Sequence, residues 1–403
     1  MHVPLLTAAT GFTSRLPAAC KLLACVVALT ACGGGGSGDT ATDLYQWNLP
    51  KGFPEPRLTS EQTLTHAQVE LGRRLFYDRR MSVNGNMSCA DCHFQSMAFT
   101  DGRTNSVGTL GDVHPRNAMS LTNVVYNATQ NWANPVTDDL HSQAMGPMFS
   151  ETPVELGWTD NEDEILARFA ADPDYQQRFA QVFPGDENPF TSDNVIQALV
   201  GFESTLISGN SPFDRSTYHG EKDALSDSAK RGMELFYSER LECFHCHGGF
   251  NFSSAVDHDG ITFLQIEFHN NGLYNIDGEG AYPAGNQGLF DITADVEDRG
   301  MFKAPTLRNI ELTAPYMHDG SIATLEEVVD HYARGGRLIE SGPNAGDGSK
   351  SPLKSNLIGS FQISEQEKTD LVAFLKSLTD WDFVCDPRFG DPFGNIPMAE
   401  ECL

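Results

Sequence analysis

Two short motifs with the pattern Cys-x-x-Cys-His are the residues of this 403-residue chain best suited to chemistry. Two thiols at this spacing can attach to the vinyl groups of a haem, and the adjacent histidine can bind its iron. Zinc is the alternative, but a zinc site would need Cys/His pairs recurring at zinc-finger spacing. The motifs therefore predict two covalently bound c-type haems. The predicted haem-binding residues are Cys89, Cys92 and His93 in the first motif, and Cys243, Cys246 and His247 in the second.

The first 32 residues have the pattern of an export signal. Arg15 and Lys21 precede a short apolar run that ends at Cys32, which predicts a signal peptide over residues 1–31. Leu29-Thr-Ala-Cys32 resembles a bacterial lipobox, in which Cys32 would carry the lipid; ordinary cleavage without a lipid is the alternative. The apolar run is too short to span a bilayer. We expect a periplasmic protein held to the membrane only by that lipid, through a flexible tether over residues 32–50.

The remaining cysteines fit an oxidising compartment. Of the nine cysteines, two leave with the signal, one is Cys32 and four belong to the haem motifs, which leaves Cys385 and Cys402. A disulfide between these two is permitted in the periplasm, and two free thiols are the alternative.

The charge of the chain restricts its partners. A formal net charge of −28 argues against nucleic-acid binding, which requires a basic surface. It suits docking to a basic partner protein or electron donor.

Helices must position the two motifs, and the sequence around each motif follows the same pattern, which indicates an internal repeat. Residues Gly72–Arg80 precede the first motif and residues Gly232–Arg240 precede the second, each with the spacing of an amphipathic helix. A closing helix is expected near Asn194–Ile207, and another is expected to begin at the capping box Ser364–Glu367. Helix, motif, loops and closing helix is the order of a class I cytochrome c.

The sequence therefore predicts a mainly α fold of two class I cytochrome c-like haem domains, related by internal duplication, with long loops. The long loops are expected at Met97–Asp112 and Glu267–Gly300. The boundary is expected in a segment rich in Gly, Ser, Pro and Asp, Ser208–Asp227. The predicted domains are 51–210 and 211–384, followed by a tail over 385–403.

The run Phe302–Gly320, together with both motifs, resembles the bacterial dihaem cytochrome c peroxidase and MauG superfamily, and the similarity covers nearly all of residues 50–380. The segments Tyr45–Pro54, Asn131–Pro135, Met148–Gly157 and Gly272–Gly278 look more like its MbnH-type branch. Members of that branch are similar to MauG and use peroxide to modify tryptophan in a partner protein.

The resemblance assigns the first haem to peroxide. Where the family has a closing histidine in a Ser-Val-Gly-His element, this chain ends in Thr109; threonine is a poor iron ligand, so the iron is expected to be open. His114 is the competing ligand. Glu155 matches the distal glutamate that moves a proton between the peroxide oxygens, although Glu151 lies close enough to be confused with it. Gln143 matches a distal-pocket glutamine.

The resemblance gives the second haem a different ligand. Tyr332 stands where classical peroxidases have a distal methionine, and a tyrosinate favours ferric over ferrous iron. The rival ligands are His331, His318 and Met317, and a packed core tyrosine is the alternative for Tyr332.

Two further assignments rest on the resemblance. Trp132 matches the tryptophan that lies between the haems and can carry charge from one to the other. Asn117 and the carbonyls of Thr313 and Pro315 match calcium ligands between the domains, and oxygen donors of this kind suit calcium.

The expected function is that of a dihaem oxidoreductase that reacts with hydrogen peroxide, forms a high-valent two-iron state and oxidises a partner protein at tryptophan. The alternative is a cytochrome c peroxidase that reduces hydrogen peroxide with electrons from a small cytochrome or cupredoxin. A non-catalytic electron-transfer cytochrome is the third hypothesis.

Overall fold

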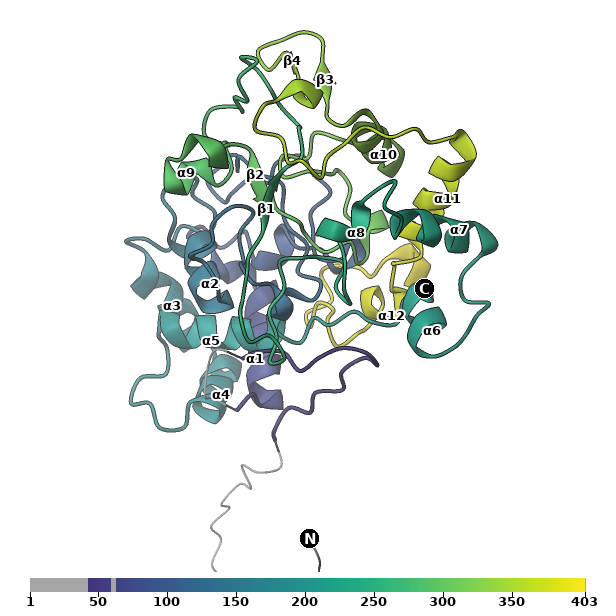
Figure 1. The fold of residues 1–403 in the computed structure, drawn as a ribbon. Coiled ribbons are helices and arrows are strands. Elements are labelled where there is room, and N and C mark those ends of the chain that lie inside the picture. The colour runs from purple at the N-terminus through teal and green to yellow at the C-terminus, as the bar shows by residue number, and fades with distance from the viewer. Residues whose placement is uncertain (1–42, 59–62, 403) are drawn as a thin grey trace, which may run out of the picture. The chain divides into compact units, whose positions relative to one another are not determined.

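The computed structural model describes residues 43–58 and 63–402 (Figure 1). The predicted signal peptide over residues 1–31, the lipidation site Cys32 and the first part of the predicted tether lie outside these described residues. Within the described part, no helix is both long enough and apolar enough to cross a membrane.

The described chain is mainly helical with very little sheet (Figure 1). Before residue 211 the helices are α1 (His66–Tyr77), α2 (Leu140–Phe149), α3 (Glu162–Ala170), α4 (Pro173–Val182) and α5 (Ser192–Glu203). After it come α6 (Pro212–Tyr218), α7 (Asp227–Phe236), α8 (Cys243–Cys246), α9 (Phe290–Thr293), α10 (Leu325–Arg334), α11 (Glu365–Lys376) and α12 (Trp381–Val384).

Two small antiparallel sheets complete the fold. In the first, β1 (Phe268–Asn270) pairs with β2 (Met301–Lys303), with Phe268 opposite Lys303. In the second, β3 (Leu338–Ile339) pairs with β4 (Gly346–Asp347). The expected long loop Glu267–Gly300 therefore also contains β1 and α9, so it is less irregular than its composition indicates.

The helix before each motif crosses the closing helix of the same half at a glycine. In α1, a Cβ added to Gly72 would lie 1.8 Å from the carbonyl oxygen of Ala198 in α5. In α7, a Cβ added to Gly232 would lie 1.9 Å from the carbonyl oxygen of Asp370 in α11. These distances are far below van der Waals contact, so only glycine permits either crossing. Two repeated sequence positions thus perform the same packing role.

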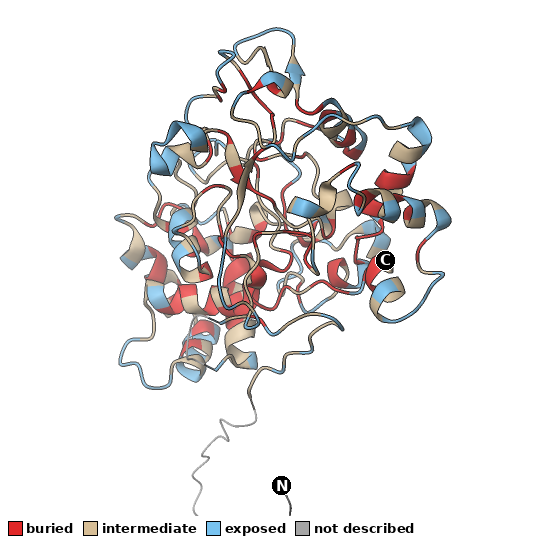
Figure 2. Cartoon of the chain, in the orientation of Figure 1, coloured by how far each residue is buried: buried red, intermediate tan, exposed pale blue. Residues whose placement is uncertain are grey.

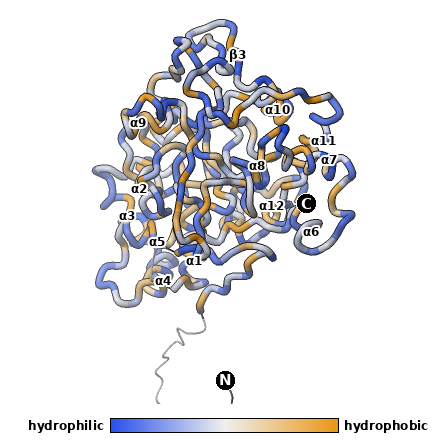
Figure 3. Tube along the Cα trace, in the orientation of Figure 1, coloured by the Kyte–Doolittle hydropathy of each residue, from blue (hydrophilic) through white to orange (hydrophobic). Residues whose placement is uncertain are grey.

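Each helix pair lies in its own hydrophobic core. The first core is built mostly from residues 71–206, and it also takes in Phe383, Val384 and Phe389 from the end of the chain. The second core is built mostly from residues 213–378. Figure 2 shows the buried residues gathered along α1 and α5 and along α7 and α11, and Figure 3 shows the hydrophobic and hydrophilic residues alternating along these helices. The mainly α class is confirmed, while the internal duplication stays a prediction.

Capping signals in the sequence mark the helix starts correctly. Thr324 and Glu327 form the capping box of α10, and Ser364 and Glu367 form that of α11, as the sequence predicts. The predicted helix near Asn194–Ile207 is α5; it begins slightly earlier and ends at Glu203.

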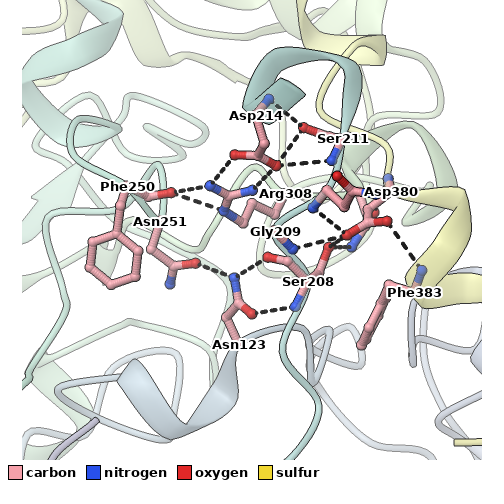
Figure 4. Close-up of polar contacts among 12 residues, drawn as sticks. Asn123, Ser208, Gly209, Ser211, Asp214, Phe250, Asn251, Arg308, Asp380 and Phe383 are labelled. Atoms are coloured by element: carbon pink, nitrogen blue, oxygen red, sulfur yellow. Dashed lines mark hydrogen bonds and ion pairs between the residues drawn. The ribbon is translucent and has the colours of Figure 1, made fainter. Parts of the chain in front are cut away.

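The segment expected to separate two domains is held by buried polar contacts (Figure 4). One carboxylate oxygen of Asp380 accepts hydrogen bonds from the Ser208 hydroxyl at 3.1 Å, the Gly209 N–H at 2.9 Å and the Asn210 N–H at 2.8 Å. From the other side, the Asn123 amide donates to the Ser208 carbonyl at 3.0 Å. Residues 208–210 are therefore fixed from both halves of the chain.

A fully buried ion pair follows a few residues after this segment. Arg308 meets Asp214 in two parallel contacts, at 2.8 and 2.9 Å, and both side chains are 0% exposed. The guanidinium also donates to the carbonyl of Phe250 at 2.9 Å through Nε. The described residues belong to one compact unit, and the predicted division at residue 210 stays a prediction.

The segments before the first core and after the second core make further contacts with the rest of the chain. Tyr45, within the expected tether, donates its N–H to the Leu64 carbonyl at 2.9 Å. Phe53 packs against Tyr126 of the first half and against Phe250 of the second. At the other end, a disulfide joins Cys385 to Cys402.

Candidate functional site

The second Cys-x-x-Cys-His motif lines a large apolar cavity. The space between protein atoms there is about 1410 Å³, part of it open to solvent. Its apolar wall includes side chains of α10 and α11 together with many from the loops and from β2. The residues of the sequence analysis that line it are Cys243, Cys246, His247, Tyr332, Trp132, Met317 and His318.

Both motif histidines are held in the same way. Nδ1 of His93 lies 2.8 Å from the carbonyl oxygen of Phe99, and Nδ1 of His247 lies 3.1 Å from that of Phe252. Burial lowers the pKa of His93, and it lowers the pKa of His247 to about 4, so both rings are neutral. A neutral imidazole that donates through Nδ1 keeps Nε2 available for a metal.

Tyr332 faces the cavity from α10. Burial raises the pKa of Tyr332 to about 12, with further contributions from Cys246 and Cys243, and a hydrogen bond from the Asn271 side chain opposes the rise. The phenol therefore shares its surroundings with the thiols of the second motif. Tyr332 lines the same cavity as Cys243, Cys246 and His247, and its role as an iron ligand stays a prediction.

The three rival ligands are placed differently. His331 is absent from the cavity lining, and its Nε2 lies 3.1 Å from the Asn271 carbonyl oxygen. His318 lines the cavity with its ring stacked on Phe302, centroids 3.6 Å apart, and its Nε2 has no hydrogen-bond partner among the described residues. Met317 lines the cavity with its sulfur accepting from the Asn271 amide at 3.4 Å.

At the first motif, the Thr109 side chain is already engaged. Its hydroxyl lies within hydrogen-bond distance of the amide oxygens of Asn84 and Asn86, at 2.8 Å in the second case. Its backbone N–H donates to the carbonyl of Glu155 at 2.8 Å. The preceding Gly108 lies so close to the Val154 carbonyl that a Cβ there would approach it to 1.9 Å. The loop around Thr109 therefore packs directly against the segment that carries Glu155.

Glu155 lies beside the first motif and is paired with a histidine. Its Oε1 is 3.8 Å from Nε2 of His114. Burial raises the pKa of Glu155, and His114 opposes that rise. The carboxylate also contributes to the raised pKa of Cys92, after burial and Asp101, which places it within electrostatic range of the motif. Glu151, the alternative carboxylate, is exposed. Gln143 is half-buried in α2.

A second, smaller cavity is lined by residues from both halves of the chain. The indole of Trp132 lines both this cavity and that of the second motif, and its Nε1 donates to the Asn117 carbonyl at 2.9 Å. All three predicted calcium ligands, Asn117, Thr313 and Pro315, line the smaller cavity. The Asn117 amide donates to the Arg103 carbonyl at 2.6 Å, so its N–H side faces protein.

Lys303 is a functional candidate that the sequence analysis did not single out. Its side chain is 4% exposed and lines both cavities. It donates to the Thr129 carbonyl, but no carboxylate pairs with it among residues 43–58 and 63–402. Burial alone lowers its pKa to about 7. The available signal is a lysine inside the otherwise apolar run Met301–Ala304.

Comparison with known proteins identifies the family. A model described as di-haem cytochrome c peroxidase matches residues 66–223. The methylamine utilization protein MauG of Methylorubrum extorquens is 33% identical over 88% of this chain and 89% of its own length. The chain belongs to the dihaem cytochrome c peroxidase and MauG family. Within this family, cytochrome c551 peroxidase of Nitrosomonas europaea is 35% identical over 77% of this chain and 79% of its own.

A solved structure of the MauG family matches most of the fold. A MauG-like protein associated with microbial copper homeostasis is 48% identical, with a TM-score of 0.84, over 87% of this chain and 99% of that one. The protein is thus a peroxide-dependent dihaem oxidoreductase of the cytochrome c peroxidase and MauG type. Membership of the family implies two c-type haems.

The residues at the second motif fit such a group. The cavity supplies two thiols, a neutral histidine and an apolar wall. Lys303 is a buried lysine without a carboxylate partner among the described residues, and a haem carries carboxylates that would supply one. The orphaned Nε2 of His318 in the same lining offers a further polar contact.

Proposed function

We propose that this protein is a periplasmic dihaem oxidase that uses hydrogen peroxide to oxidise a partner protein, at tryptophan. The observation that carries the proposal is the presence of Tyr332 in the cavity of the second motif, next to Cys243 and Cys246. A phenolate ligand favours oxidised iron, which suits a site that holds oxidising equivalents better than one that delivers electrons. The 48% identity to a MauG-like structure supports the same branch.

At the first motif, Cys89 and Cys92 would hold one haem and His93 would bind its iron. When bound, the haems supply the electrons that reduce peroxide. Position 109 carries threonine, whose hydroxyl is engaged with Asn84 and Asn86, so no histidine closes the first site from that position. The first site is therefore ready for peroxide without a preceding reduction.

Glu155 would move the proton of the reaction. Its carboxylate takes a proton from the near oxygen of the peroxide and returns it to the far oxygen, which leaves as water. Burial keeps the pKa of Glu155 above its ordinary value, so its carboxylate accepts a proton more readily than that of an exposed glutamate. His114, 3.8 Å away, can exchange this proton with solvent. Gln143 would orient the peroxide from α2.

Between the two motifs, Trp132 would carry charge from one site to the other. It lines both cavities, and its indole N–H is fixed by the Asn117 carbonyl. The same cavity would hold one calcium ion through the side-chain oxygen of Asn117 and the carbonyls of Thr313 and Pro315. Such an ion would keep the two cores in register around Trp132.

A second function is favoured by the curated relatives. Proteins named cytochrome c peroxidase align over most of this chain at 33–35% identity. In that case the partner would be a small cytochrome or cupredoxin that donates electrons. In either role a basic docking face on the partner would complement the net charge of −28.

The nature of the partner decides between these functions. The ferric holoprotein is incubated with peroxide and a periplasmic extract of its host, without added reductant, and tryptophan-containing peptides are examined by mass spectrometry. We expect oxygen addition or loss of hydrogen at tryptophan in one small exported protein, and no such change with E155Q. Unmodified tryptophan, combined with rapid peroxide-dependent oxidation of a reduced cytochrome or cupredoxin, would establish the peroxidase instead.

A further inference from the structure

Four aromatic side chains form a continuous row that begins at the wall of the second-motif cavity. The rings of Phe302 and His318, which both line the cavity, are stacked with their centroids 3.6 Å apart. The ring of Tyr282 follows, with its centroid 6.3 Å from that of Phe302 and 6.2 Å from that of His318. The ring of Tyr274 comes next, edge-on to Tyr282 at 5.3 Å. Neither tyrosine is part of the cavity lining, so the row leads away from the cavity.

The far end of this row approaches the surface of the protein. The hydroxyl of Tyr274 donates to a carboxylate oxygen of Asp319 at 2.5 Å, and Asp319 is only half-buried. The chain after Tyr274 turns over residues 277–279, which are all exposed. This turn is closed by the Ile276 N–H, which donates to the Ala281 carbonyl at 3.1 Å. The row therefore connects the wall of the cavity to a site just beneath solvent.

The two phenols of the row differ in their hydrogen-bond acceptors. The Tyr282 hydroxyl donates to the neutral side-chain oxygen of Asn270 at 2.9 Å, whereas that of Tyr274 donates to the carboxylate of Asp319. Burial raises the pKa of both phenols, and Asp319 adds to the rise at Tyr274, so both are protonated at neutral pH. A phenol that loses one electron becomes a strong acid and must release its proton. A carboxylate can take that proton and an amide cannot, so Tyr274 is the better equipped for one-electron oxidation.

We propose that Tyr282 and Tyr274 form the route by which oxidising equivalents pass from the second haem to the partner protein. An electron passes from Tyr274 by way of Tyr282 to the oxidised haem, and the phenol proton of Tyr274 moves to Asp319. The neutral tyrosyl radical then takes one electron from the partner and recovers its proton from Asp319. Two such passages supply the two electrons that one peroxide consumes. The inference rests on the proposed function and adds the place at the surface where the partner is oxidised.

The composition of the row and of its surroundings suits this role. Tyrosine can be oxidised by one electron, while the stacked rings of Phe302 and His318 fill the space between the cavity and Tyr282. An electron tunnels farther through such packed atoms than across a gap. The exposed turn after Tyr274 carries Asp277 and Glu279, and two carboxylates beside the end of the route favour the approach of a basic partner.

Electron paramagnetic resonance detects the radical that this route requires. The ferric holoprotein is mixed with peroxide and freeze-quenched, and the absorbance of the haems is followed in parallel. Ring-deuterated tyrosine in the protein distinguishes a tyrosyl radical from a radical on Trp132. The matched control is Y175F: Tyr175 is also buried and its hydroxyl also donates to a carboxylate, that of Asp78 at 2.9 Å, but it lies in the first core.

We expect a tyrosyl signal in the wild type and in Y175F, and its loss in Y274F. D319N keeps an oxygen for the hydrogen bond but cannot take the proton, so it should lose the signal as well. Y282F should delay the signal, because the electron must then cross a ring that is not oxidised. The haems of all these variants should respond to peroxide as in the wild type, since none of the three residues lines either cavity.

Tryptophan modification in the periplasmic extract of the host measures delivery to the partner. We expect Y274F to lose this modification and Y175F to retain it. If the wild-type haems respond to peroxide but no tyrosyl signal forms, or if Y274F keeps the signal or modifies tryptophan at the wild-type rate, the route is wrong and the proposed function stands. If the wild-type ferric haems do not respond to peroxide, the proposed function fails, and the inference fails with it.

Discussion

At the scale of single residues, we expect two positions to make the motifs chemically different. Thr109 stands where a closing histidine would shut the first site, and its hydroxyl is engaged with asparagines. Tyr332 stands in the cavity of the second motif. The same Cys-x-x-Cys-His chemistry is therefore expected to give one site that receives peroxide and one that holds oxidising equivalents.

Replacement of Glu155 by glutamine tests the proton transfer at the first site. Glutamine keeps the size of the side chain but cannot accept a proton, so we expect the reaction with peroxide to slow by about 100-fold or more. In the wild type the active form is the carboxylate, whose pKa burial raises. The rate should therefore fall as pH decreases from neutral through this raised pKa, and E155Q should lose that pH dependence. Stopped-flow rates across this range provide the measurement.

The control for this substitution is E151Q. Glu151 lies four residues before Glu155 and is exposed, so its replacement changes the net charge equally without touching the site. Wild-type rates in E155Q, or an equal loss in E151Q, would contradict the role of Glu155.

Replacement of Lys303 by methionine tests whether a positive charge on this side chain raises the reduction potential of the second haem. Methionine retains the length of the chain and removes the ammonium group, which is 4% exposed and has no carboxylate partner among the described residues. A positive charge near a haem favours its reduced form, so we expect K303M to lower the potential of the second haem and K303R to preserve it. A redox titration with identical potentials in wild type and K303M would show that Lys303 faces no haem carboxylate.

At the scale of elements, the helices could be predicted from the sequence, but the positions of the irregular segments between them could not. Capping boxes at Thr324 and Ser364 and the apolar spacing around Gly72 and Gly232 locate helices correctly, because caps and helical periodicity are local signals. Asn271 and residues 208–210 lie in segments without such periodicity. Their positions depend on contacts with residues about 50 to 170 positions away, which no local pattern encodes.

Replacement of Asp380 by alanine tests whether its hydrogen bonds hold residues 208–210 in place. Its carboxylate accepts from Ser208, Gly209 and Asn210, and also caps α12 by accepting from the Phe383 N–H at 3.1 Å. D380A would leave several buried donors without an acceptor, so we expect a loss of about 3 kcal/mol in the free energy of unfolding. Urea denaturation measures this loss.

The matched variant for Asp380 is D382A. Asp382 lies two residues further on, is exposed, and accepts only from the Asn210 side chain. Its loss should change stability by less than about 1 kcal/mol. Equal effects of D380A and D382A would show that the buried network does not hold the two halves together.

At the scale of the whole molecule, the tail returns to the first core. Phe383, Val384 and Phe389 belong to that core although they follow the second half in sequence, and the disulfide between Cys385 and Cys402 closes the segment around Phe389 over a separation of 17 residues. We expect the double variant C385S/C402S to lose about 3 kcal/mol in the free energy of unfolding, as for a loop of this length. Unchanged urea denaturation would mean that the packing of Phe389 alone retains the tail.

The candidate site was predictable where residue spacing carries the chemistry. The motif cysteines and histidines follow from their pattern, and the resemblance supplied Tyr332, Trp132 and Asn117, which line the cavities that the structure contains. The placement of Lys303 and Asn271 depends on hydrogen bonds between distant segments. Such contacts exist only once the chain has folded.

The reaction of the fully ferric protein with hydrogen peroxide tests the central claim most directly. In a stopped-flow spectrometer, with no reductant present, we predict an immediate spectral change at both haems whose rate is first order in peroxide. Prior reduction by one electron should not be needed, because no histidine at position 109 closes the first site. A ferric protein that stays unchanged in peroxide and reacts only after half-reduction would contradict the account and identify a classical electron-fed peroxidase.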